Sequence, residues 1–212
     1  MGYYGIILTS SDGISWDNRT HPSTSSDLLG VTYANSTFVI GGESGIILTS
    51  SDGTTWTKRT SNVNGRFNGV TYGNNTFVIV LSSHYVLTSS NGTTWDDYNR
   101  GSSTTLRGVI FANNTFTAVG NSGTIITSSD GISWTSRTSG TTERFNGVTY
   151  GNNAFVVVGY SGTILTSTDG ATWTEQISGT TNTLFGVTYG NDTFVAVGHA
   201  SVGYSGTVFT SP

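Results

Sequence analysis

The sequence predicts an all-β fold, a five-bladed β-propeller with four antiparallel strands in each blade. Two markers repeat along its 212 residues. A Gly-Val dipeptide recurs every 39 residues, at Gly30, Gly69, Gly108, Gly147 and Gly186. Five tryptophans keep step with it, at spacings of 40, 39, 39 and 39 residues. A period near 40 residues with four strands per copy is typical of propeller blades, which usually number about four to eight.

The copy that begins at Gly147 illustrates the expected blade. Short runs rich in Val, Thr, Ile, Phe and Tyr alternate with the turn sequences Gly-Asn-Asn, Gly-Tyr-Ser-Gly and Thr-Asp-Gly. Runs of this kind, bounded by Gly, Asn and Asp, indicate antiparallel strands joined by hairpins. No stretch shows a sustained period of 3.6 residues, so we expect almost no helix.

The two ends of the chain are predicted to share one blade of a single domain, residues 1–212. The chain opens at a third strand, Ile6–Ser10, and closes with first, second and third strands over Gly186–Ser211, so third strands occur six times. We expect residues 1–20 to complete the last blade, because a five-residue insertion before Gly206 makes the C-terminal copy the irregular one. The surplus strand would lie on the surface, pair with the edge of another chain, or mark a segment of a longer array.

Composition excludes several classes of partner. The net charge is -4 with only eight Lys plus Arg, which leaves no basic stripe for nucleic acid. No apolar run approaches the roughly 18 residues of a membrane span, and the first residues lack the pattern of a signal peptide. The chain has no Cys. Cytoplasm and virion both remain compatible locations.

Charged residues make up 9% of the chain, so Ser, Thr and Asn must supply the surface polarity, which suits neutral polar partners.

A seven-residue pattern, Ser-x-(Asp/Asn)-Gly-x-x-Trp, precedes each predicted fourth strand. It occurs at 10–16, 50–56, 89–95, 128–134 and 167–173. The pattern resembles the Asp-box of sialidase-like propellers, shortened by one residue between Asp and Trp. The whole repeat is similar to propellers of bacterial, photosystem-assembly and phage-tail proteins, which implies a structural role for these turns.

The pattern residues are expected to build the blade rather than a site. An Asp in such a turn accepts hydrogen bonds from backbone N–H groups about two residues on, and the following Gly adopts the left-handed conformation. Asn can replace Asp in this role, and the tryptophans are expected to cover the turn and the blade core. The structural set is Asp12, Trp16, Asp52, Trp56, Asn91, Trp95, Asp130, Trp134, Asp169 and Trp173.

Catalysis is not expected. Glycoside hydrolysis needs two carboxyl groups about 5–9.5 Å apart, yet the Gly-Val-Thr-Tyr and Gly-Val-Ile-Phe inner strands carry no acid. Arg66, Arg107 and Arg144 precede successive inner strands, as an arginine cluster for a carboxylate would, but their registers disagree and no Tyr-Glu pair accompanies them. The three His residues show no metal-ligand spacing. We therefore expect no enzyme activity, no metal and no cofactor.

The predicted ligand-binding surface is the loop face, formed by the connections from second to third strands and from fourth to first strands. These connections vary between copies, whereas the Asn-Asn turns and Asp turns are nearly constant. Plain drift of loop sequences is the alternative explanation. The candidate binding residues are Glu43, Arg66, His84, Arg107, Asn121, Arg144, Tyr160, His199 and Tyr204.

The predicted function is that of a non-catalytic recognition module that binds glycans at several sites. Ser, Thr, Asn and Tyr suit neutral polyols, and related sites multiply a weak affinity. Five-bladed lectins of the tachylectin type are a precedent by analogy. The alternatives are a scaffold that binds a protein partner, a structural propeller, and an amplified or designed repeat without a dedicated ligand. We expect a monomer, with edge pairing through the surplus third strand as the other option.

Overall fold

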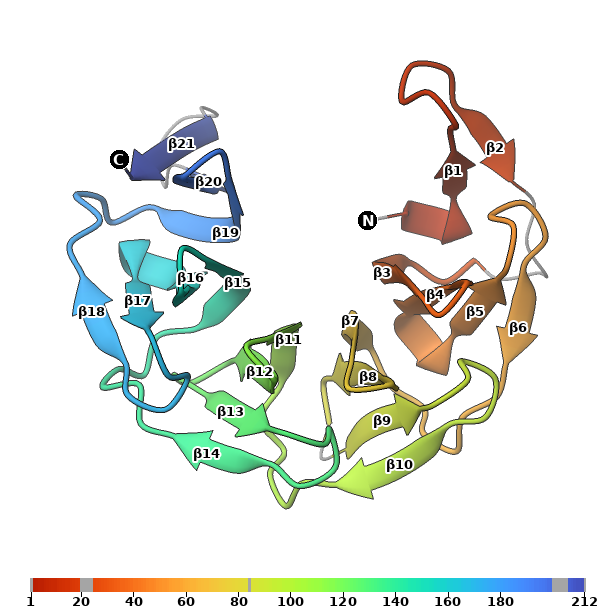
Figure 1. Ribbon diagram of the computed structural model, residues 1–212, viewed down its shortest axis with the longest axis horizontal. Coiled ribbons are helices and arrows are strands. Elements are labelled where there is room, and N and C mark those ends of the chain that lie inside the picture. The colour runs from red at the N-terminus through yellow and green to blue at the C-terminus, as the bar shows by residue number, and fades with distance from the viewer. Residues whose placement is uncertain (1, 20–24, 84, 200–205, 212) are drawn as a thin grey trace. The chain divides into compact units, whose positions relative to one another are not determined.

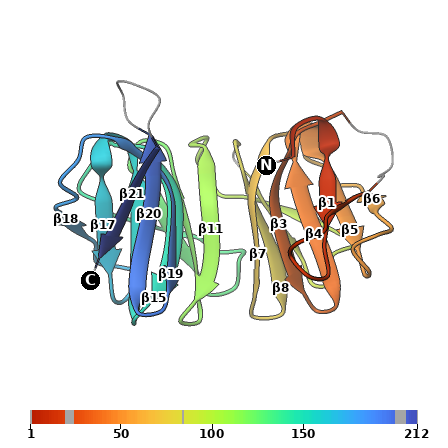
Figure 2. The same ribbon diagram turned by 90° about the horizontal axis from the view of Figure 1, so that it is seen from above.

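A computed structural model describes residues 2–19, 25–83, 85–199 and 206–211 (Figure 1). These residues form 21 strands and three 3-10 helices of three residues each. The chain divides into two compact units, Met1–Ser102 and Ser103–Pro212. Figure 2 shows the strands of each unit aligned along a common axis and alternating in direction, with turns at the two ends.

The first unit contains one two-stranded and two four-stranded antiparallel sheets. The small sheet pairs β1 (Ile7–Thr9) with β2 (Asp17–Arg19). The next comprises β3 (Leu28–Ala34), β4 (Thr37–Gly42), β5 (Ile47–Ser50) and β6 (Thr57–Arg59). The last comprises β7 (Phe67–Gly73), β8 (Thr76–Leu81), β9 (Tyr85–Ser89) and β10 (Asp96–Asn99). Two 3-10 helices accompany them, η1 (Tyr3–Gly5) and η2 (Glu43–Gly45).

The second unit contains two four-stranded antiparallel sheets and one three-stranded sheet. The first comprises β11 (Leu106–Ala112), β12 (Thr115–Gly120), β13 (Ile125–Ser128) and β14 (Thr135–Arg137). The second comprises β15 (Phe145–Gly151), β16 (Ala154–Gly159), β17 (Ile164–Ser167) and β18 (Thr174–Gln176), with η3 (Tyr160–Gly162) between β16 and β17. The third comprises β19 (Thr183–Gly190), β20 (Thr193–His199) and β21 (Gly206–Ser211).

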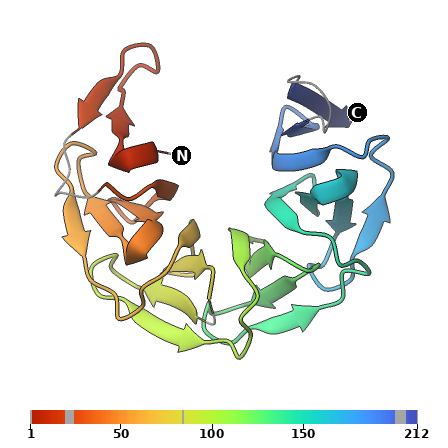
Figure 3. The same cartoon turned by 180° about the vertical axis from the view of Figure 1, so that it is seen from behind.

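The four-stranded sheets confirm the predicted all-β class and the four antiparallel strands of a blade. Strand order in each follows the chain, so each is a simple meander. Within each unit the first strands of neighbouring sheets contact one another, β3 with β7, β11 with β15 and β15 with β19 (Figures 1 and 3). The only described helices are the three short 3-10 turns, as the absence of a helical period predicts.

Local sequence explains the hairpin between the first and second strands. In the β7–β8 turn, Asn74 and Asn75 both have positive φ, 45° and 57°. Two left-handed residues make the turn whose twist matches that of antiparallel strands, and Asn tolerates this conformation. The same pair of left-handed positions recurs in the turns after β3, β11, β15 and β19.

A β-bulge interrupts the first strand of five sheets, near the start of β3, β7, β11, β15 and β19. In β7 the register shifts between Phe67 and Gly69, which leaves Asn68 as the extra residue. The equivalent extra residues are Leu29, Arg107, Asn146 and Phe185. Because a bulge redirects the side chain it carries, these positions become important at the loop face.

The hydrophobic core lies between neighbouring sheets of a unit. In the first unit, Val39 and Ile47 of one sheet form a cluster with Phe67, Phe77 and other residues of the next. In the second unit, Val119 and Ile125 cluster in the same way with Phe145 and Val157. In these two clusters the second and third strands of one sheet are covered by the following sheet, which is the packing of repeat proteins.

The end segments have their own pairing. Gly2 and Leu28 exchange two backbone hydrogen bonds of 2.9 Å, which join residues before η1 to β3. In the described residues β1 pairs with β2, and β21 pairs with β20. Completion of the last blade by residues 1–20, and a single domain over 1–212, concern the two units together and stay predictions. No described helix has the length and apolar character needed to cross a membrane.

Candidate functional site

The loop face is held together by backbone hydrogen bonds within each sheet. The residue that follows the second strand donates to the carbonyl of the residue before the first strand. The bonds are Glu43 N to Asp27 O at 2.9 Å, Ser82 N to Arg66 O at 3.1 Å, Asn121 N to Thr105 O at 2.9 Å and Tyr160 N to Arg144 O at 2.8 Å. The two sets of variable connections therefore meet side by side in these sheets.

Neighbouring sheets of a unit are also joined at this face. Gly45 N donates to Gly65 O at 2.7 Å, and Gly123 N donates to Glu143 O at 2.8 Å. Both donors have positive φ, 71° and 66°, which Gly adopts without steric cost. Each bond ties a second-to-third-strand turn to the linker of the following sheet, so the loops form a continuous framework within their unit.

In the first unit the structure brings together two candidate residues, Glu43 and Arg66. The Arg66 guanidinium forms an ion pair with the Glu43 carboxylate, and their side chains are 48% and 36% exposed. Arg66 Nε also donates to Asn68 Oδ1 at 3.0 Å. The bulge residue Asn68 thus holds the arginine toward the turn that carries Glu43.

In the second unit the structure pairs Arg107 with Asn121 and Arg144 with Tyr160. Arg107 Nε donates to Asn121 Oδ1 at 2.7 Å. The Arg144 guanidinium carbon lies 3.8 Å from the centre of the Tyr160 ring, an arrangement favoured by the attraction between a cation and an aromatic face. Arg144 Nε donates to Asn146 Oδ1 at 3.0 Å, just as Arg66 does to Asn68.

The bulge explains why the registers of the three arginines differ. Arg66 and Arg144 stand two residues before a bulge Asn, whereas Arg107 is itself the bulge residue of β11. All three guanidinium groups nevertheless contact a residue on the loop face. Asn68 and Asn146 are not among the residues predicted from the sequence, although the repeated Arg-Phe-Asn-Gly-Val sequence marks both positions.

The remaining candidates are not part of these pairs. His199 is the last residue of β20 and is exposed; among the described residues it has no hydrogen bond or ion pair with another candidate. His84 and Tyr204 lie outside the described residues. In the described part of the chain, no group of three or more His, Asp or Glu side chains could hold a metal ion.

The Asp turns have a capping geometry. Asp52 Oδ1 accepts hydrogen bonds from Thr54 N and Thr55 N, both 2.8 Å, and Ser50 Oγ accepts one from Gly53 N at 2.8 Å. Asp12, Asp130 and Asp169 accept the equivalent pair of bonds. Asn91 Oδ1 does the same, at 2.8 and 3.0 Å, so an amide caps this turn as a carboxylate does.

Capping also shifts the acidity of these carboxyl groups. The hydrogen bond from Thr172 N, followed by that from Ala171 N, lowers the pKa of Asp169 to about 2. The bonds from Thr55 N and Thr54 N lower the pKa of Asp52 well below its usual range. Hydrogen bonds to the ionised form stabilise it, and a carboxylate held ionised in this way is a poor proton donor near neutral pH.

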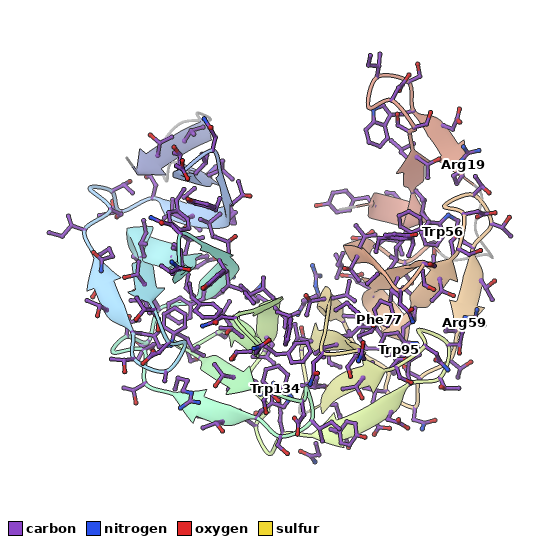
Figure 4. The ribbon with its side chains drawn as sticks, viewed as in Figure 1. Arg19, Trp56, Arg59, Phe77, Trp95 and Trp134 are labelled. Carbon is purple, nitrogen blue, oxygen red and sulfur yellow. The ribbon has the colours of Figure 1, made fainter. Side chains whose placement is uncertain are left out.

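Four of the five tryptophans pack in their sheets, and Trp16 does not. Trp56 and Trp95 are 6% exposed, and each donates from Nε1 to the carbonyl of the turn glycine at 3.1 Å. Trp134 and Trp173 make the same bond and are partly buried. In Figure 4 the rings of Phe77 and Trp95 lie close together.

Trp16 differs from the other four, since it is 58% exposed within the first unit. In the complete sheets a phenylalanine of the second strand faces the indole, with ring centres 6.2 to 6.5 Å apart. The β1–β2 sheet has no second strand. Trp16 consequently lacks the aromatic partner that its repeats have within their own sheets.

Two open polar clefts occupy equivalent places in the second unit. One, of about 660 Å³, lies beside Ser122, Arg137 and Ser139. The other, of about 810 Å³, lies beside Ser161, Gln176 and Ser178, each 39 residues further on. Both are bounded by a second-to-third-strand turn and by the linker after a fourth strand.

Comparison with known proteins shows the fold. No family model matches the sequence, and no curated protein matches it. YCF48 from Cyanidioschyzon merolae has a similar structure, with a TM-score of 0.64, 15% identity, and coverage of 88% of this chain and 73% of that chain. YCF48 bound to D1 peptide gives a TM-score of 0.55 at 17% identity, covering 93% and 84%.

A chain from a nidogen/laminin complex gives a TM-score of 0.62 at 14% identity, with coverage of 87% of this chain and 79% of that chain. At these identities the likeness shows architecture alone. Together with the repeated antiparallel sheets, it confirms the class predicted from the sequence: this chain is a β-propeller.

Proposed function

We propose that this chain is a non-catalytic propeller that binds an extended segment of a protein partner on its loop face. The observation that carries the proposal is the set of arginines on that face, each held by a neighbouring side chain. Arg66 contacts Glu43, Arg107 contacts Asn121, and Arg144 lies over Tyr160. The side chains that hold them, Glu43, Asn121 and Tyr160, are polar, and polar groups of this kind can bond to the backbone of an extended peptide.

The energetics of these contacts favour a role in binding. An exposed ion pair such as Arg66–Glu43 contributes at most about 1 kcal/mol to stability. Arg and Tyr are enriched in protein interfaces, where they contribute a large share of the affinity. A guanidinium already fixed against Asn146 and Tyr160 loses less conformational freedom when a carboxylate or backbone carbonyl binds to it.

The structural comparisons support a protein partner. Two of the similar structures are of YCF48, and one of these two contains YCF48 bound to a D1 peptide. The peptide complex is a property of YCF48. At 17% identity, none of its peptide contacts can be assigned to residues of this chain. It supports the scaffold alternative for this chain because a propeller of related architecture holds a peptide.

Two features support a non-catalytic role. The first strands carry no acid in their Gly-Val cores, and the capped Asp turns hold carboxylates of lowered pKa. The same turns, with Ser and Asp sharing the N–H groups, support their interpretation as degenerate Asp-boxes that serve the fold.

The proposal is tested by selecting peptides from a random library on the intact chain and measuring their affinity by calorimetry. We expect Arg66→Ala to weaken peptides that bind the first unit at least tenfold, and Arg144→Ala to weaken peptides that bind the second unit by the same factor, which corresponds to about 1.4 kcal/mol. Arg59→Ala is the matched control, because Arg59 is a fourth-strand residue that donates to Thr49 Oγ1. Equal affinities for all three variants and the native chain would contradict docking on the loop face.

A multivalent glycan-binding function is the second candidate, favoured by the two equivalent clefts of the second unit. Ser139 and Ser178 occupy corresponding places in them, and repeated sites raise a weak affinity. A glycan array followed by calorimetry distinguishes the two functions. More than one sugar bound per chain, with loss on Ser178→Trp, would replace the peptide proposal; no hit at high protein concentration would remove the glycan candidate.

A further inference from the structure

The chain contains four Asn-Gly dipeptides, which differ in how firmly the fold holds them. They are Asn64-Gly65, Asn68-Gly69, Asn91-Gly92 and Asn146-Gly147. In such a dipeptide the backbone nitrogen of the glycine can attack the side-chain amide carbon of the asparagine, because glycine has no side chain to hinder the approach. The attack needs local freedom of the backbone, so its rate at each dipeptide depends on the surrounding structure.

The Asn91-Gly92 dipeptide is held by the geometry of its turn. Asn91 Oδ1 accepts hydrogen bonds from Thr93 N and Thr94 N at 2.8 and 3.0 Å. Gly92 N donates to Ser89 Oγ at 2.8 Å. The attacking nitrogen and the amide that it would attack are therefore both engaged, and the turn has to open before they can react.

The two bulge asparagines are held by bonds to their side chains. Asn68 Oδ1 accepts from Arg66 Nε, and Asn68 Nδ2 donates to Ser82 Oγ, both at 3.0 Å. Asn146 has the corresponding arginine contact, and its Nδ2 donates to Leu184 O at 2.7 Å. The glycines that follow them lie inside β7 and β15 and pair with the second strands. Reaction at either site requires these contacts to break first.

The Asn64-Gly65 dipeptide is held least. Asn64 is exposed and lies in the linker between β6 and β7 (Figure 1). Within the described part of the chain, neither its side chain nor the N–H of Gly65 forms a hydrogen bond. The Gly65 carbonyl, by contrast, accepts the bond of 2.7 Å from Gly45 N that joins the two sheets. The most reactive of the four dipeptides therefore borders a contact between neighbouring sheets.

We propose that Asn64-Gly65 is a site of spontaneous covalent modification, at which Asn64 becomes an aspartyl or isoaspartyl residue. Gly65 N forms a bond to Asn64 Cγ, and the side-chain amide nitrogen leaves as ammonia, taking with it the proton of Gly65 N. Solvent water then opens the resulting cyclic imide. Cleavage of the new bond to Cγ gives the aspartyl residue, and cleavage of the original peptide bond gives the isoaspartyl residue. No oxidation or reduction is involved.

Both products change the loop face of the first unit. Each adds a carboxylate two residues before Arg66, whose guanidinium forms an ion pair with Glu43. The isoaspartyl product also lengthens the main chain before Gly65, which displaces the carbonyl that accepts from Gly45 N. Gly45 has no room to follow, since a Cβ on it would stand 2.9 Å from Val63 O. This change is independent of any bound partner and therefore goes beyond the proposed function.

The test incubates the intact chain at mildly alkaline pH and follows each asparagine by mass spectrometry of tryptic peptides. Cleavage after Arg59 and Arg66 releases residues 60–66, which separates Asn64 from the three other dipeptides. We expect Asn64 to lose its amide at least tenfold faster than the other three asparagines, which corresponds to about 1.4 kcal/mol in the free energy of local opening. In concentrated urea the four rates should become similar, because unfolding removes the protecting contacts.

Two variants locate the reaction. Asn64→Gln should block it, since the longer side chain forms a cyclic imide far less readily. Asn62→Gln is the matched control, because Asn62 is exposed in the same linker but precedes Val63, whose branched side chain hinders attack. The control should react at Asn64 as the native chain does. Hydrogen exchange at Gly45 N–H should become faster as the native chain reacts, and Asn64→Gln should prevent this.

Three results would overturn the proposal: equal rates at the four dipeptides of the folded chain, loss of the amide at residue 62 rather than 64, or hydrogen exchange at Gly45 N–H that stays unchanged after Asn64 has reacted. No peptide takes part in these measurements, so failure of the proposed function on the loop face would leave their outcome unaffected.

Discussion

One buried hydroxyl departs from the pattern of its repeats. Thr117 in β12 is fully buried, and its Oγ1 has no hydrogen-bond partner in the described structure. The four other copies hold valine at this place, at Val39, Val78, Val156 and Val195. Threonine and valine have nearly the same shape, but a buried hydroxyl without a partner is destabilising.

We therefore predict that Thr117→Val raises the free energy of unfolding by about 1 kcal/mol. Urea denaturation followed by circular dichroism measures the change. Thr127→Val is the control, because Thr127 is buried but accepts a hydrogen bond from Arg137 Nε at 2.8 Å, and its replacement should destabilise the chain. A loss of stability in both variants would contradict this explanation of Thr117.

Among the elements, the Asp169 turn between β17 and β18 makes the stability of its hairpin depend on pH. The pKa of Asp169 is lowered to about 2 by N–H donation from Thr172 and Ala171, whereas an unfolded Asp titrates near its ordinary 3.8. A lowered folded-state pKa contributes stability that is complete above the unfolded value and is lost as pH falls through the folded value. The capping contribution of Asp169 therefore disappears between about pH 4 and pH 2.

We predict that Asp169→Asn makes stability less dependent on pH in this window. Asn91 caps the equivalent turn with an amide that does not titrate, so the substitution keeps the geometry and removes the titration. Asn91→Asp is the converse variant and should steepen the dependence. Thermal midpoints recorded from pH 2 to pH 6 measure both, and parallel curves for all three proteins would contradict the prediction.

The elements that sequence predicts well are those set by neighbouring residues. The Asn74-Asn75 turn and the capping by Asp52 depend on a few consecutive residues, so the repeat alone reveals them. The exposure of Trp16 depends on which strands share its sheet, and the contacts of Arg66 and Arg144 depend on bulges and on other segments. Such tertiary relations are not encoded in local spacing, so the repeated Arg-Phe-Asn-Gly-Val sequence marks the bulge Asn residues without revealing what they contact.

For the molecule as a whole, the low content of charged residues predicts that stability depends only weakly on salt concentration. Charged residues make up 9% of the chain, and the two ion pairs among the described residues, Arg19–Asp17 and Arg66–Glu43, both involve exposed side chains. Exposed pairs contribute at most about 1 kcal/mol each and are screened by salt.

We predict that raising NaCl from about 0.05 to 0.5 M shifts the melting temperature by less than about 8 °C, because two pairs of at most about 1 kcal/mol each correspond to about 4–8 °C in a domain of this size. Differential scanning calorimetry measures the shift. A larger fall would mean that ion pairs, rather than apolar contacts between sheets, dominate stability. Arg66→Ala removes one of the two ion pairs, so the melting temperature of this variant should change less with salt than that of the native chain.

Trp16 should also differ from the buried tryptophans in its fluorescence. Its indole meets water while those of Trp56 and Trp95 lie in an apolar, rigid setting. Its emission should therefore occur at longer wavelength and be open to collisional quenching by a small neutral solute. Anything that covers the β1–β2 sheet will shift that emission to shorter wavelength, so the protein carries an intrinsic reporter of contact at this one place.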